Sequence, residues 1–182
     1  QLTISEGVAL APGQELIISA EIDQTQFVRL VVEEAYHAGA KHVEVMWKDP
    51  EIARIRLRDG SDEAIAYAPA WYFDSIARAH RENAARLAIA SSDPEALAGL
   101  PMDRLAISSR AVGKAAKGTS QLVGDFAINW CVVGAASAAW AQRVFPGLPV
   151  DEAVALLWEK ILLSSRVFEP DPVAAWIAHS EA

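Results

Sequence analysis

The chain has 182 residues, the length of one domain or of one domain with a small appendage, and it can bury a core without a disulfide or a metal. Its 16 Lys and Arg residues against 24 Asp and Glu residues give a net charge of −8, which argues against nucleic-acid binding and against docking on anionic lipid. The single cysteine, Cys131, excludes an internal disulfide and a thiolate zinc cluster, and it favours a reducing, cytoplasmic location.

No apolar run approaches the ~18 residues that a membrane-spanning helix needs. The first residues, 1–6, lack the basic and apolar regions of a signal peptide, and the chain does not begin with Met. We therefore expect a protein that crosses no membrane, and a chain that is a processed product or a piece of a longer one.

Hydrophobic periodicity predicts strands and helices that alternate along the chain. The segment 16–47 has the length of a βαβ unit, whose crossover is nearly always right-handed. In chain order we expect a strand at 16–18, a helix from Asp23 to Gly39, strands at 43–47 and 52–57, helices at 63–67 and 70–82, a strand at 86–90, helices at 92–99 and 103–116, a strand at 126–133, and helices at 138–145, at 151–166 and from 171 onward.

Four of these predictions depend on short local signals. Asp23 and Gln26 have the spacing of a capping box at a helix start. Residues 52–57 place arginines on one face of a predicted edge strand, where charge discourages further pairing. Residues 92–95 combine a capping residue, a proline and an acid at a helix start, and the glycine-rich segment 113–124 indicates a flexible loop.

The alternation predicts one α/β domain over residues 1–182 with three layers, α-β-α. The central sheet should have about four or five strands and be mainly parallel or mixed, with helices on both faces. At least the first two strands should be parallel, and the order of the later strands stays open.

Two segments invite comparison with phosphate-binding motifs, and neither fits. Residues 19–23, after the first predicted strand, contain no glycine and include two carboxylates that would repel a pyrophosphate. In segment 113–120, Thr119 stands where the lysine of a P-loop should be, and a predicted helix precedes the segment instead of a strand. We interpret 113–120 as a surface loop.

His37, His42, Glu44 and Asp49 lie close together in the sequence and could indicate a metal site. Each has a structural explanation, since His37 lies at a helix end, His42 and Glu44 share a strand face, and Asp49 precedes a proline in a turn. A two-metal hydrolase needs several converging carboxylates and imidazoles, which these residues do not supply. The other histidines lie far away in the sequence, at or near helix ends: His80 and His179.

No catalytic nucleophile is evident. Cys131 lies in a predicted apolar strand, which raises the pKa of a thiol and hides it from substrate, and no G-x-S-x-G elbow occurs. We therefore predict no catalytic, cofactor-binding or metal-ligating residue in this chain. Among the six tryptophans, Trp176 lies on a terminal helix with nothing after it to pack against, so we expect its partner in another domain or chain.

A family resemblance is carried by a series of short sequence stretches that follow one another along nearly the whole chain. In the first half they are Pro12-Gly13-Gln14, Ala35-Tyr36 with Gly39-Ala40, Val43-Glu44-Val45 with Trp47, Pro69 with Trp71, and Asp93-Pro94. In the second half they are Asn129-Trp130, Ala139-Trp140-Ala141-Gln142-Arg143-Val144-Phe145-Pro146, Glu152-Ala153, Leu157-Trp158 and Asp171-Pro172-Val173-Ala174-Ala175-Trp176. Their joint order resembles the thermophilic metalloaminopeptidase family, of the aminopeptidase T, aminopeptidase S and PepS type. One departure is Ala136-Ser137, where the family usually has a Pro-Thr pair, and it affects the geometry of that loop.

The resemblance implies a two-domain, homodimeric enzyme that removes N-terminal residues from peptides with a pair of divalent metal ions, zinc or cobalt. In that family the metal ligands and the catalytic glutamate lie in a C-terminal domain, so none of them maps onto a residue here. The resemblance therefore implies an N-terminal domain that walls the cleft, limits access to small peptides and docks on the catalytic domain, and that is inactive alone.

A free-standing interaction module, with the Trp176 helix as its partner surface, is the alternative function. A small-molecule-binding α/β protein is a third and weaker hypothesis, because the phosphate loop is absent.

Overall fold

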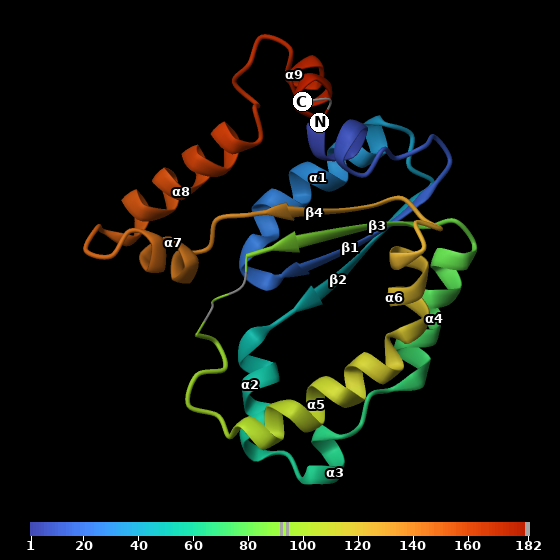
Figure 1. Ribbon diagram of the computed structural model, residues 1–182, viewed down its shortest axis with the longest axis vertical. Helices are drawn as coiled ribbons and strands as arrows, with labels where there is room; N and C mark the ends of the chain where they lie inside the picture. Colours follow the sequence, from blue (N-terminus) through green and yellow to red (C-terminus); the bar gives the residue numbers. More distant parts are fainter. Residues whose placement is uncertain (92, 94, 181–182) are drawn as a thin grey trace.

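A computed structural model describes residues 1–91, 93 and 95–180, and Figure 1 shows how the elements are arranged. The strands are β1 (Glu15–Glu21), β2 (His42–Lys48), β3 (Ala85–Ala90) and β4 (Trp130–Gly134). The helices are α1 (Thr25–His37), α2 (Pro50–Asp59), α3 (Asp62–Ile65), α4 (Ala70–Arg81), α5 (Met102–Ala115), α6 (Lys117–Gly124), α7 (Ala138–Val144), α8 (Val150–Ser164) and α9 (Pro172–Ser180). A π-helix, η1 (Thr3–Gly7), and a 3-10 helix, η2 (Ile22–Gln24), precede α1.

The four strands form one parallel sheet with the order β2-β1-β3-β4. In the register, Ile18 of β1 lies opposite Val45 of β2 and Leu87 of β3. The chain steps from β1 to β2 in one direction and then crosses back to β3 and β4, so right-handed crossovers place α1 and α4 on opposite faces. The predicted α/β class is confirmed, and the sheet is wholly parallel.

The first face of the sheet holds the main core. Alternate residues of β1 and β3 are buried there against the apolar stripe of α1 and the N-terminal segment. Burial of this kind, at about 25 cal/mol per Å² of apolar surface, is the main stabilising term of the domain. The buried members of this core are Ile4, Val8, Leu10, Leu16, Ile18, Ala20, Val28, Val31, Ala35, Ala85, Leu87, Ile89 and Ala135.

The second face is only partly covered. Helix α4 lies over the β1–β2 part of this face, where Ile76 lines a small cleft together with Ile17 and Met46. At the two edges of this face, Glu44 of β2, which lines the same cleft, and Val132 of β4 remain exposed. The domain therefore has two helical layers that cover the sheet unequally.

The helices α7 and α8 form a second, smaller core that joins the first through one residue. Trp158 of α8 packs against both buried clusters, and its ring centroid lies 5.2 Å from that of Phe27 on α1. Helix α8 also carries the apolar pattern at i, i+3 and i+4 that predicted it. Its observed bounds differ by one or two residues from the predicted 151–166, as helix ends commonly do.

The predicted edge strand at 52–57 is wrong, because these residues belong to helix α2. Asp49 precedes Pro50, and its carboxylate accepts hydrogen bonds from the backbone of Glu51 and Ile52. A capping acid followed by proline at the first helical position starts a helix. The apparent alternation at 52–57 also fits helical spacing, which the short window could not distinguish from a strand.

The predicted flexible loop at 113–124 is also wrong, because the end of α5 and the whole of α6 occupy it. Lysine, alanine and leucine favour helix strongly enough to tolerate Gly113 and Gly118 inside the helices, at about 1 kcal/mol each, and Gly124 is the last residue of α6. Gly118 has a packing role, since a Cβ built on it would lie 3.4 Å from the Cβ of Ala77 on α4.

Three predicted boundaries move as well. Asp23 does not cap α1, because it lies within η2 and the helix begins at Thr25. Strand β4 begins at Trp130, because Phe126 adopts φ +52° just after α6 ends. The predicted helix at 92–99 includes two positions outside the described residues, and residues 95–99 form hydrogen-bonded turns instead of an α-helix.

Candidate functional site

The carboxyl ends of the parallel strands border a cleft of about 340 Å³. In open parallel sheets, ligands bind outside the carboxyl ends of the strands, at the point where the strand order reverses. The reversal here lies between β1 and β3, and Glu21 and Ser91 line the cleft at that point. We refer to this feature as the carboxyl-edge cleft.

The carboxyl-edge cleft is acidic. Its lining includes no lysine, arginine or histidine among the described residues. A concave surface with one sign of charge attracts cationic groups and repels phosphate or carboxylate groups. The carboxylates that line it come from the end of β1 and from the segments that follow β1, β2 and β3: Glu21, Asp23, Asp49, Glu51 and Asp93.

Several polar groups of the cleft are engaged in holding its loops. Asp49 Oδ1 accepts a hydrogen bond from the Glu51 amide at 2.9 Å, which caps α2. Ser137 Oγ accepts one from the Trp140 amide at 3.2 Å and so caps α7. Such capping bonds stabilise a helix start by about 1 kcal/mol. These side chains therefore shape the cleft as well as line it.

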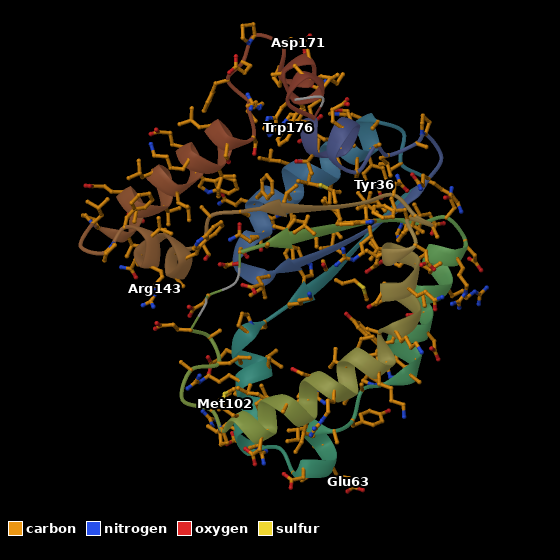
Figure 2. The ribbon with its side chains drawn as sticks, in the orientation of Figure 1. Tyr36, Glu63, Met102, Arg143, Asp171 and Trp176 are labelled. Carbon is orange, nitrogen blue, oxygen red and sulfur yellow. The ribbon has the colours of Figure 1, made fainter. Side chains whose placement is uncertain are left out.

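Two further contacts join the loops around the cleft. The Ser91 hydroxyl, which is buried, donates to Glu21 Oε2 at 3.5 Å across the β1–β3 junction. Arg143 of α7, labelled in Figure 2, forms an ion pair with Glu95 at 2.9 Å, which links α7 to the segment after β3. Both partners of that pair are solvent-exposed, so its contribution to stability is small.

The residues considered as a metal site make separate local contacts. His37 Nδ1 lies 3.9 Å from a carboxylate oxygen of Glu34, and His42 Nε2 lies 3.5 Å from Glu44. Asp49 caps α2 at the carboxyl-edge cleft, at the other end of β2 from His42. Within residues 1–91, 93 and 95–180, no group of three or more His, Cys, Asp or Glu side chains is arranged to hold a metal ion.

The other residues singled out from the sequence lie away from the cleft. Cys131 is half-buried beside Gly7, and burial raises the pKa of its thiol. His80 is buried in α4, where Nδ1 lies 2.9 Å from the Ala84 carbonyl oxygen, and burial lowers its pKa. The segment 113–120, compared above with a P-loop, is helical.

Sequence reasoning did not find the carboxyl-edge cleft, although a signal was present. Glu21 closes β1, Asp49 follows β2 directly, and Asp93 follows β3 within three residues. Acids at the ends of successive parallel strands converge on one edge of the sheet. From the sequence alone, Glu21 indicates only a segment unfavourable for a nucleotide, and Asp49 is grouped with three residues near it in the sequence and explained as a turn residue.

None of the helices in the described part of the chain combines the length and the apolar character that a bilayer span requires.

Comparison with known proteins shows similarity along the whole chain. The family model described as thermophilic metalloprotease (M29) matches residues 1–182. Aminopeptidase T of Thermus thermophilus is 44% identical over 182 residues, which are 100% of this chain and 45% of that protein. Aminopeptidase AmpS of Bacillus subtilis is 40% identical over 181 residues, again 100% of this chain and 44% of the relative.

The fold is similar to a solved structure, wild-type AmpT from Thermus thermophilus, with a TM-score of 0.90 and 44% identity. The superposition covers 99% of this chain and 44% of that one. The chain thus spans less than half the length of the relatives that it matches.

Proposed function

Because the chain belongs to the thermophilic metalloprotease (M29) family, we propose that it is the N-terminal α/β domain of a metal-dependent aminopeptidase acting on peptides. Its role in that enzyme is architectural: it forms a wall of the substrate cleft, restricts access to small peptides and docks on the catalytic domain. The chain alone is inactive. The complete enzyme is a cytoplasmic homodimer.

The observation that carries this proposal is that the matches cover this chain fully or almost fully but cover less than half of each relative. Relatives named as aminopeptidases match the chain from end to end, yet the match accounts for only 44–45% of their length. A domain can share its fold with a family without carrying the family's chemistry, so function has to be argued from the site. In this chain the carboxyl-edge cleft is the candidate site that its position in the fold supports.

The two divalent metal ions of the proposed enzyme, zinc or cobalt, do not fit the described residues of this chain. A co-catalytic pair needs several carboxylate and imidazole ligands that converge and are oriented by further hydrogen bonds. In the acidic cleft Asp49 already accepts two backbone hydrogen bonds, and no histidine lines the walls. We therefore assign both metals to polypeptide outside this domain.

The alternative function, an interaction module with Trp176 as its partner surface, loses its main support. The indole N–H of Trp176 (Figure 2) donates to the Ser165 carbonyl at 2.9 Å, and its ring meets His179 edge to face. Trp176 thus has partners within the chain, contrary to the expectation from its terminal position.

The proposal is tested by an aminopeptidase assay on two proteins, the 182-residue chain and the complete protein from its whole reading frame. An amino-acyl chromogenic substrate is supplied with cobalt or zinc. We expect turnover by the complete protein and a rate equal to the metal-only blank for the chain. Metal-dependent turnover by the purified chain, at rates like those of the complete protein, would show that the active site lies here.

A further inference from the structure

The two edge strands of the sheet differ in charge. At one edge, β2 carries His42, Glu44 and Lys48, all exposed, and charged side chains are what natural edge strands use against further pairing. At the other edge, β4 carries none. It lies within residues 126–142, the longest stretch of the chain without a charged residue or a histidine. Only one edge of this sheet is therefore protected by charge.

Apolar side chains at this edge are exposed. Val132, at the centre of β4, is 52% exposed on the partly covered face of the sheet. Phe126 is 81% exposed and holds φ +52°, a backbone conformation that favours glycine or asparagine. Its ring lies 6.4 Å from that of Trp130, the first residue of β4. The edge thus combines a costly backbone conformation with aromatic surface that the domain itself does not bury.

The backbone of β4 also offers hydrogen bonds on its outer side. The Arg86 amide donates to the Asn129 carbonyl at 3.0 Å, and the Ala135 amide donates to the Ala90 carbonyl at 2.9 Å. Backbone groups of a strand alternate in direction, so those of Trp130, Val132 and Gly134 point away from β3. Among the described residues, the one hydrogen bond made by these outward-pointing groups is the one that the Val132 carbonyl accepts from the neighbouring Cys131 thiol, at 3.7 Å.

We propose that a strand from the polypeptide outside this domain pairs with β4 in the complete protein and extends the sheet. This inference rests on the proposed function, in which the chain is one domain of a longer enzyme. In the relatives, more than half of the polypeptide lies outside the region that matches this chain, and polypeptide of that kind would supply the pairing strand. Helix α9 lies on the β4 side of the molecule, whereas α2, α3 and α5 lie on the opposite side (Figure 1). Polypeptide joined after α9 would therefore start on the same side of the molecule as the unprotected edge.

The pairing strand should be largely uncharged on the side chains that meet Val132 and Phe126, because a charge there would lose its hydration without gaining a partner. Main-chain hydrogen bonds would supply the pairing, and the exposed apolar groups would determine which segment fits. The proposed docking surface is therefore β4 together with Phe126, and the carboxyl-edge cleft is not part of it.

Residue-resolved hydrogen exchange on the complete protein and on the 182-residue chain tests this pairing. We expect the Val132 amide to exchange at least about 100-fold more slowly in the complete protein, because it gains a hydrogen bond there. The amides of Cys131 and Val133 point toward β3 and should be protected in both. Equal exchange of the Val132 amide in the two proteins would overturn the proposal.

Exchange of the Val132 amide could instead be slowed in the isolated 182-residue chain, and increasingly so at higher protein concentration. That result would show that a second copy of the chain binds the β4 edge, and it would also overturn the proposal.

The variant Val132→Lys supplies a second readout, with Val112→Lys on the distant α5 as its matched control. We expect Val132→Lys to lower the urea midpoint of the complete protein and to leave that of the 182-residue chain unchanged. An equal fall in both would show that Val132 acts only within the domain. Aminopeptidase activity of the complete protein, measured separately, tests the proposed function without bearing on these results.

Discussion

Gln14 and Asn129 lie 115 positions apart in the sequence and bind each other through both ends of their side-chain amides. Nε2 of Gln14 donates to Oδ1 of Asn129 at 2.7 Å, and Nδ2 of Asn129 donates to Oε1 of Gln14 at 3.1 Å. Gln14 also donates to the Asn83 carbonyl, and Asn129 to the Val8 carbonyl, each at 2.8 Å. One pair of amides therefore joins four segments at the amino end of the sheet. Both residues belong to stretches that carry the family resemblance.

Removal of this pair should destabilise the domain. In Asn129→Ala, the buried Gln14 amide loses a partner and the Val8 carbonyl loses its donor, which should cost about 1–3 kcal/mol in the free energy of unfolding. Urea unfolding measures the loss. The control is Gln142→Ala, an exposed amide on α7, with an expected change within about 0.5 kcal/mol.

The same pair should show coupling in a double-mutant cycle. Because the two side chains share hydrogen bonds, the double variant Gln14→Ala/Asn129→Ala should lose less than the two single losses added together, by about 0.5–3 kcal/mol. Strict additivity would mean that the two amides act independently.

The buried His80 should make stability depend on pH. Burial lowers the pKa of His80 below its ordinary value of 6.5, the hydrogen bond to Ala84 opposes this, and the nearby Arg86 charge adds to it. The side chain is only 2% exposed, and its Nε2 has no partner among the described residues. The unfolded chain therefore binds a proton more readily, so His80 should reduce stability as the pH falls below 6.5 toward its lower folded pKa.

The variant His80→Gln keeps an N–H donor for the Ala84 carbonyl but cannot titrate. Urea unfolding of wild type and variant between about pH 5 and pH 8 isolates the contribution of His80, because the other groups titrate alike in both. We expect the wild type to lose stability relative to the variant on the acid side. Parallel curves would contradict a depressed His80 pKa.

Arg104 should hold the α2–α3–α5 region together. Its Nε donates to the Leu57 carbonyl at 2.7 Å, another N–H donates to the Gly60 carbonyl, and Nη1 pairs with Asp62 at 3.1 Å. Lysine has no planar fork with which to reach three such acceptors at once. We expect Arg104→Lys to increase limited proteolysis and amide exchange within residues 57–67. Arg110→Lys, at an exposed position of the same helix, should leave both unchanged.

Trp158 should couple the α7–α8 hairpin to the main core, because it packs against both buried clusters. We expect Trp158→Ala to cost about 3 kcal/mol, the lower end for large aromatic truncations, since the ring is only partly buried. The matched control is Trp71→Ala, whose side chain is 73% exposed. Thermal unfolding of the two variants should differ clearly, and similar Tm values would show that α8 is held by other contacts.

Much of the secondary structure could be predicted from local signals. The apolar run at 16–18, the alternation at 43–47 and the Gly39 helix end all lie where expected, the last with φ +88°. The errors came where one local pattern fitted two structures. Residues 52–57 alternate like a strand but follow a capping acid and a proline, and 113–124 contains glycines within a sequence that otherwise favours helix.

By itself, the sequence determined most of the strands and helices and the α/β class, because periodicity, caps and breakers act over a few residues. Only the tertiary structure decided which distant loops meet. The strand order brings Glu21, Asp49 and Asp93 to one cleft, pairs Gln14 with Asn129, and leaves β4 at an unprotected edge. That order follows from long-range packing of the core, in which each strand's neighbours depend on the other strands and helices together, and no window of local sequence contains it.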